Sequence, residues 1–148
     1  MTVRASHPAY PATRYEPAPP VDLTAKGERE RLSPSALKAF FSIIAHWSVR
    51  DPDARALLGG VSNGPYYSWK KDPRRTLGPD TLTRISYLVG IFKALNILYG
   101  EEIADTWITL PNNHRLFGGD TPLAYMKAGG VPALQVVRRL LDARRGGV

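Results

Sequence analysis

The sequence predicts an all-α protein, and three observations support this fold class. Apolar residues recur at intervals of three or four over long stretches, which is the spacing of one face of a helix. Prolines and paired glycines divide these stretches, with Ser, Thr or Asp where helices would begin. No stretch convincingly shows the alternation of apolar and polar residues that marks a half-buried strand.

The first segment, residues 1–32, is predicted to be a proline-rich extended tail. Five of the thirteen prolines in the chain precede Leu23. Proline fixes φ and lacks an N–H group, so this density of prolines favours an extended chain. Residues 25–31 alternate in charge and are expected to form a solvated lead-in turn. The tail is either a mobile extension or an arm that becomes ordered on a partner.

The next region, 33–99, is predicted to be helical throughout. Ser33 suits an N-cap, and Pro34 suits the first helical position. The apolar stripe that follows consists of Leu37, Phe40, Phe41, Ile44 and Trp47. Two short helices are expected at 53–58 and 66–71, on either side of a glycine-rich turn.

A longer helix is predicted from Pro79 to Tyr99. Its apolar residues cover more than one face, so it is expected to be buried on two sides. Those sides lie either between two subdomains or in a dimer interface.

The last region, 100–148, is predicted to form a small helical domain. A short helix with an acidic first turn is expected at 101–109, because negative charge is favourable at a helix N-terminus. An irregular segment follows, then a helix from Thr121 to Gly130. A final helix is expected from Val131 to Arg145.

Composition argues against an enzyme and against a bound cofactor. The chain has no cysteine, and its three histidines lie far apart without a metal-ligand neighbour at helical spacing. It also has no glycine-rich phosphate loop of the Walker type. Neither a catalytic residue set nor a metal site is therefore predicted.

The charge balance predicts acidic partners. A net charge of +7 with a pI near 9.9 attracts phosphate backbones or an acidic protein surface. The chain shows neither a signal peptide nor an uninterrupted apolar run of membrane-spanning length, which predicts a cytoplasmic protein.

The two short helices around the glycine turn resemble a helix-turn-helix. Cations near the second helix are positioned to meet phosphates: Lys70, Lys71, Arg74 and Arg75. The turn at 59–64 is about one residue longer than the tight form. The second helix offers Tyr66, Tyr67 and Trp69 rather than the side chains that pair with base edges. These aromatic residues are equally suited to pack the helices together.

A more specific pattern lies in the second half of the chain. It comprises Trp107, Pro111-Asn112, Leu116-Phe117-Gly118, Thr121-Pro122-Leu123 and Gly129-Gly130, followed by a final Leu/Val-rich helix. This pattern resembles the toxin-binding domain of the Xre/MbcA/ParS antitoxins, and within that family it resembles the ParS type. The upstream matches are Leu57 to Ser62, Trp69-Lys70 and Leu82 to Ile85; they resemble the helix-turn-helix half of the same family. The resemblance covers about residues 35–148.

The resemblance implies a partner rather than a reaction. Antitoxins of this family are encoded beside RES-domain toxins, which resemble ADP-ribosyltransferases and consume NAD or transfer its ADP-ribose. The antitoxin is expected to occlude the toxin's active-site cleft, and the complex often binds its own promoter. The expected assembly is a homodimer or a toxin–antitoxin heterotetramer. The alternative is a DNA-binding transcriptional regulator without a toxin partner.

Within the toxin-binding region, structural residues can be separated from contact residues. Trp107 is expected to belong to the core rather than to the contact surface. The predicted contacts are polar or terminal groups without an evident structural role: Asn113, His114, Arg115, Tyr125, Lys127, Arg144, Arg145, Gly146, Gly147 and Val148. The two C-terminal glycines would let the chain end enter a narrow cleft. The other interpretation of this end is a frayed basic terminus.

Overall fold

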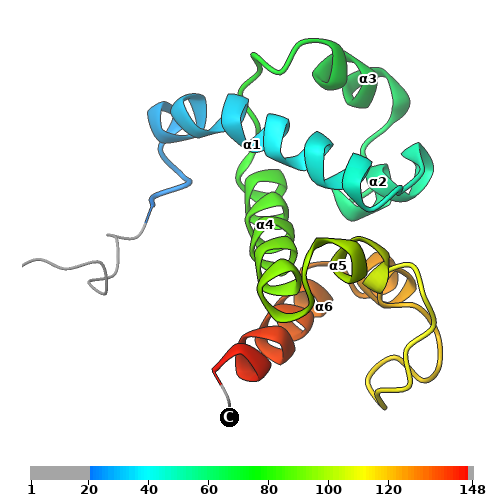
Figure 1. Ribbon diagram of the computed structural model, residues 1–148. Coiled ribbons are helices and arrows are strands. Elements are labelled where there is room, and N and C mark those ends of the chain that lie inside the picture. Colours follow the sequence, from blue (N-terminus) through cyan, green and yellow to red (C-terminus); the bar gives the residue numbers. More distant parts are fainter. Residues whose placement is uncertain (1–20, 147–148) are drawn as a thin grey trace, which may run out of the picture.

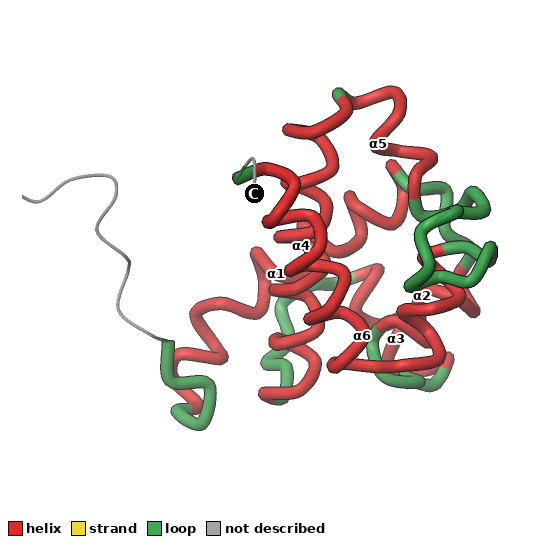
Figure 2. The backbone as a smooth tube through the Cα atoms, turned by 90° about the horizontal axis from the view of Figure 1, so that it is seen from below, coloured by secondary structure: helices red, strands yellow, loops and turns green. Residues whose placement is uncertain are grey.

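The computed structural model describes residues 21–146, which form six helices and contain no strand (Figures 1 and 2). The expected all-α fold is confirmed. The helices are α1 (Lys26–His46), α2 (Asp51–Leu57), α3 (Asn63–Lys71), α4 (Pro79–Tyr99), α5 (Glu101–Trp107) and α6 (Pro122–Arg145).

Helix α4 is the central element of the fold. It packs against α1 in its N-terminal half and against α5 at its C-terminal end, while α6 runs along it from Arg84 to Tyr99 (Figure 1). By length and composition alone α4 is apolar enough to cross a membrane. However, its residues Leu82, Ile85, Leu88, Ile91 and Leu95 are buried among the other helices, as in the core helix of a folded domain. The prediction that this helix is buried on two sides is confirmed.

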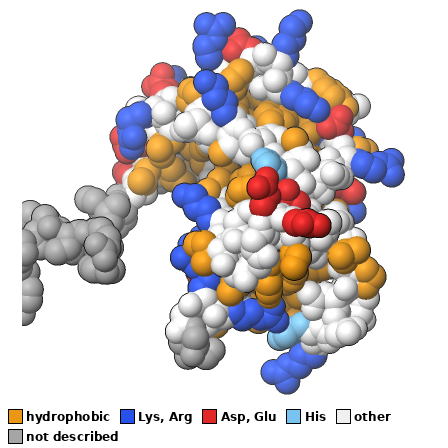
Figure 3. Space-filling view, viewed as in Figure 1, with side chains coloured by type: hydrophobic (Ala, Val, Ile, Leu, Met, Phe, Trp, Pro, Cys, Tyr) orange, Lys and Arg blue, Asp and Glu red, His pale blue; other side chains and the backbone are white. Residues whose placement is uncertain are grey.

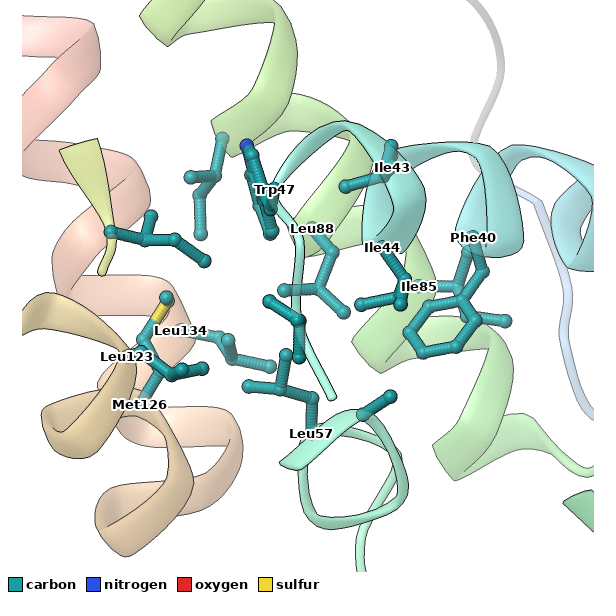
Figure 4. Close-up of a cluster of buried hydrophobic side chains, with 14 of the residues drawn as sticks. Phe40, Ile43, Ile44, Trp47, Leu57, Ile85, Leu88, Leu123, Met126 and Leu134 are labelled. Carbon is teal, nitrogen blue, oxygen red and sulfur yellow. The ribbon is translucent and has the colours of Figure 1, made fainter. Parts of the chain in front are cut away.

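One continuous core joins the N-terminal and C-terminal parts of the fold (Figure 4). In the upstream part of this core, Phe40 of α1 lies near Ile85 of α4, and Ile44 lies near Leu88. Leu123 and Leu134 of α6 belong to the same cluster. The two predicted regions, 33–99 and 100–148, therefore share a core, and α4 contributes to both.

The predicted start of the first helix was wrong. Helix α1 begins at Lys26, inside the range assigned to the extended tail, so Ser33 and Pro34 lie within it. Ser33 is fully buried, and its hydroxyl donates to the carbonyl of Arg29 at 2.6 Å while accepting the N–H of Leu77 at 2.9 Å. A serine hydroxyl that bonds back to the preceding turn is compatible with a helix interior. The tertiary contact with Leu77 uses the group that sequence patterns assign to an N-cap.

The other helix boundaries differ from the predictions by zero to three residues. Helix α3 begins at Asn63 rather than at Tyr66, because Pro65 lies in the first turn, where no N–H donor is required. Helix α4 has the predicted bounds, while α5 ends at Trp107 rather than at Thr109.

Helix α6 is kinked at the predicted break. Gly130 has φ 63° and ψ −148°, a conformation essentially restricted to glycine, so two helical segments meet there. The hydroxyl of Thr121 accepts the N–H of Ala124 at 3.0 Å and caps the first segment as predicted.

Candidate functional site

The segment between α5 and α6, residues 108–121, is a projection whose two ends are bonded to each other, and we call it the closed projection. At its base the N–H of Leu123 donates to the carbonyl of Ile108 at 2.9 Å, and the N–H of Asn112 donates to the carbonyl of Asp120 at 3.0 Å. These bonds hold both ends of the segment together. Its exposed side chains are therefore presented by a defined backbone.

Phe117 is the hub of this projection. It is 6% exposed, and the rings of Trp107 and Tyr125 pack edge-on against it at centroid distances of 5.8 and 5.5 Å. Trp107 is only half-buried, although it packs against the core as expected. Tyr125, predicted as a contact, is also half-buried and so combines a packing role with a partly accessible ring.

His114 has a structural role in the same segment. Its ring Nδ1 accepts the backbone N–H of Leu116 at 3.0 Å, and the backbone N–H of His114 donates to Oδ1 of Asn112 at 2.8 Å. These two bonds hold the ring and the main chain of His114 within the turn. The neighbouring Asn113 and Arg115 are exposed and available for contact.

Three of the remaining predicted contacts, Lys127, Arg144 and Arg145, are exposed but already take part in local pairs. Lys127 binds Asp53 of α2 at 2.7 Å, which joins α6 to the N-terminal part. Arg144 donates to the hydroxyl of Tyr99 at 2.7 Å, and Arg145 lies 3.7 Å from Asp142. Gly146 is exposed. Gly147 and Val148 lie outside the described residues.

The basic residues around α3 are exposed, but they are not all free cations. Lys70 lies 3.3 Å from Asp51, and Arg74 lies 3.0 Å from Asp72. Arg75 donates to the hydroxyl of Ser68 at 3.2 Å. For Lys71, the structure records no ion pair within residues 21–146.

The aromatic residues of α3 fasten it to α2. Tyr66 is fully buried and packs edge-on against Phe41, while Tyr67 is 47% exposed. Both hydroxyls donate to the carboxylate of Asp51, at 2.9 and 2.8 Å. The bonds from Tyr67, Tyr66 and Lys70 lower the pKa of Asp51. Burial, together with the Asp51 bond, raises the pKa of Tyr66.

Comparison with known proteins identifies the family to which this chain belongs. A family model described as the antitoxin Xre/MbcA/ParS C-terminal toxin-binding domain matches residues 94–147. An uncharacterised protein y4oB of Sinorhizobium fredii is 42% identical over 115 residues, which is 77% of this chain and 87% of that protein. The chain belongs to the Xre/MbcA/ParS antitoxin family.

The matched domain of this antitoxin contains the closed projection, α5, α6 and the last turns of α4. Of the predicted contact residues, all except Val148 fall within the match. The family assigns toxin binding to this region as a whole and does not select individual residues.

Sequence reasoning missed apolar side chains that the antitoxin exposes in this domain. Ile103 is 57% exposed and Leu110 is 54% exposed. In the sequence they look like ordinary core positions, because spacing alone does not reveal which face of the short helix α5 lacks a packing partner.

Sequence reasoning also missed a mixed histidine and carboxylate cluster. One potential metal-binding atom from each of His46, Glu101 and Asp105 lies within 4.8 Å of the others. On the face seen in Figure 3, acidic side chains gather beside a histidine. His46 is separated from α5 by more than fifty positions, so local spacing could not reveal the cluster. Nδ1 of His46 lies 3.3 Å from a carboxylate oxygen of Asp105, within hydrogen-bonding distance, which is a sufficient structural role.

Proposed function

We propose that this antitoxin neutralises a RES-domain toxin that consumes NAD, and that its C-terminal segment occludes the active-site cleft of the toxin. The observation that carries this proposal is the placement of the end of α6. Arg144 and Arg145 are exposed there, and Arg144 is tethered to Tyr99 of α4. The end of the helix is thus held at a fixed place on the surface (Figure 1).

The chemistry of this end suits a cleft that binds NAD. A site for a dinucleotide offers cationic or backbone donors to the pyrophosphate and commonly an acid to the ribose. Arg144 or Arg145 would pair with the acid. Asn113, His114, Arg115, Tyr125 and Lys127 would then make the contacts around the cleft.

Deletion of residues 144–148 tests the mechanism. The expected result is an antitoxin that folds and still binds the toxin, while much of the NAD consumption by the toxin returns. The comparison is the pair Asn113→Ala and Arg115→Ala in the full-length chain, which removes contacts of the projection and leaves the C-terminal segment in place. Full inhibition by the shortened antitoxin would contradict occlusion by the C-terminus and assign the cleft to the projection.

We also propose that the antitoxin binds its own promoter through α3. The exposed side chains of Asn63, Tyr67 and Lys70 lie at helical spacing on one face of α3. The predicted phosphate contacts are Lys70, Lys71, Arg74 and Arg75. Of these, Lys70 and Arg74 already face carboxylates, so Lys71 should contribute most per residue.

Promoter binding is tested by substituting Lys71→Gln and measuring affinity over a range of salt concentrations. A plot of log K against log salt concentration has a negative slope, and loss of one phosphate contact should make that slope shallower by about 0.9. Lys38→Gln on α1, also an exposed lysine, is the control and should leave the slope unchanged. A salt dependence that is steep and unchanged in Lys71→Gln would place the DNA on another surface.

The alternative function is a DNA-binding regulator without a toxin partner. Co-expression with the product of the neighbouring reading frame separates the two, because only the antitoxin should co-purify with that product. Light scattering then tests the homodimer on the free antitoxin and the heterotetramer on the purified complex.

A further inference from the structure

A polar hollow of about 380 Å³ lies where the α2–α3 turn meets the kink of α6. Two glycine pairs face it, Gly59-Gly60 from the turn and Gly129-Gly130 from the kink. Gly59, Gly60 and Gly130 have positive φ of 94°, 86° and 63°. The absence of side chains at these four positions keeps the hollow open.

Arg84 of α4 provides positive charge in this hollow. Its side chain is only 17% exposed, and its guanidinium lies against the turn, since a Cβ on Gly59 would lie 3.1 Å from the Arg84 Cζ. A Cβ on Gly130 would lie 3.8 Å from Nη2, so the guanidinium end faces the kink. Within residues 21–146 the structure records a hydrogen bond only for Nε, to Asp80 at 2.8 Å. The Nη donors are therefore available to a ligand.

The helix ends at this place offset one another, because the positive end of the dipole of residues 131–145 lies beside the negative ends of α2 and of the first segment of α6. Lys127 also lines the hollow, and its ammonium uses one donor on Asp53. The site thus combines a guanidinium and an ammonium, each of which is already paired through one donor, with Asp80 and Asp53, and keeps its other donors for a ligand.

We infer that this hollow is an oxyanion site that receives a carboxylate side chain, Asp or Glu, of the toxin. The inference rests on the proposed antitoxin function. Arg84 is recessed, so a slender side chain reaches it more readily than a phosphate on the convex surface of a DNA duplex. In addition, Lys127 and the kink belong to the segment matched by the toxin-binding family, 94–147.

The test measures the toxin affinity of the full antitoxin carrying Arg84→Gln. Removing one partner of a recessed charged pair should raise the Kd at least about 30-fold. Arg84→Lys, which keeps the charge but loses the fork, should fall between this variant and wild type. Lys38→Gln removes an equal charge from a distant exposed site of α1 and should bind as wild type.

A second pair of variants guards against loss of folding in Arg84→Gln. Ala128 is exposed and lines the hollow, so Ala128→Glu offers the site a carboxylate from the antitoxin itself. This variant should bind the toxin at least about tenfold more weakly than Ala128→Gln, which has the same size without the charge. Equal affinity of these two variants would overturn the inference. So would an Arg84→Gln variant that keeps its melting temperature and its toxin affinity.

A separate titration distinguishes failure of the site from failure of the proposed function. Acetate added to the free antitoxin should shift the amide signals of Gly59, Gly60 and Gly130 in wild type but not in Arg84→Gln. Shifts caused by inorganic phosphate and not by acetate would overturn the carboxylate assignment, as would loss of promoter binding alone in Arg84→Gln. A wild-type antitoxin that responds to acetate yet ignores the toxin would contradict the proposed function and leave the anion site in place.

Discussion

Ser48 ends α1 in a conformation that usually belongs to glycine. Its φ is 53°, and it is the one non-glycine residue with positive φ in the described part of the chain. The N–H of Val49 bonds to the carbonyl of Ile44 at 3.1 Å, and the N–H of Ser48 bonds to that of Ala45 at 3.1 Å. These two bonds form a Schellman motif, in which the left-handed position favours glycine.

Ser48→Gly is therefore expected to raise the free energy of unfolding by about 1 kcal/mol, because a side chain in left-handed backbone costs about that much. Ser42→Gly in the exposed middle of α1 should lower it by about 0.5 kcal/mol. Chemical denaturation of both variants checks the pair. A loss of stability in Ser48→Gly would mean that its side chain contributes more than its backbone strain costs.

Gly130 shows the opposite case at the residue scale. Its φ and ψ are accessible essentially only to glycine, so Gly130→Ala should cost about 1–3 kcal/mol. Gly64→Ala is the control, because Gly64 lies in α3 with open space around it and should gain up to about 1 kcal/mol. The melting temperature should fall in Gly130→Ala and rise in Gly64→Ala. A Gly130→Ala variant as stable as wild type would show that the kink relaxes freely.

At the scale of elements, Asp51 determines how α2 and α3 meet. The carboxylate stands in the first turn of α2 and accepts both tyrosine hydroxyls of α3. The charged form is favoured by these bonds and by the helix dipole. Two short helices, neither stable alone, are held together by one side chain.

This arrangement predicts a pH dependence of stability. The pKa of Asp51 is lowered on folding, so its contribution is complete above the unfolded value, about 3.9, and is lost as pH falls through the folded value. The unfolding free energy should therefore decrease below about pH 4, and Asp51→Asn should flatten that decrease. Asp72→Asn is a useful comparison, because the Asp72 pKa is also lowered but by a local, exposed arginine. An unchanged acid slope in Asp51→Asn would show that the tyrosine bonds form equally with the neutral group.

At the scale of the whole molecule, the core formed by residues 21–146 begins in the second turn of α1. In the described part of the chain every buried residue lies at or after Ser33. Leu23 is half-buried against the core, and its carbonyl accepts a bond from Arg29 at 2.8 Å. The described part of the chain therefore joins the core at Leu23.

Removal of residues 2–20 should leave the melting temperature and toxin neutralisation unchanged. Removal of residues 2–24 should lower the melting temperature by a few degrees, because it takes away Leu23 and the acceptors of Arg29. Calorimetry and rescue of toxin-arrested cells check both. Lost rescue by a stably folded variant that lacks residues 2–20 would assign the tail a role in binding.

The sequence by itself determined the helices and the family. Apolar spacing with proline and glycine punctuation placed α4 without error and located the break in α6, because these signals are local. The run of motifs from Trp107 to Gly130 identified the toxin-binding domain. Asn113 and Arg115 were correctly expected to be exposed.

Only the tertiary structure decided what distant segments do to each other. Ser33 carries the signature of a helix start, yet its contact with Leu77, forty-four positions away, places it inside α1. Arg84 resembles any solvated arginine in the sequence, but the two glycine turns that surround it come from positions 59–60 and 129–130. The local patterns of a chain record backbone preferences within a few residues. The hollow and the bonds from the two tyrosines of α3 to Asp51 depend on packing that brings separate helices together.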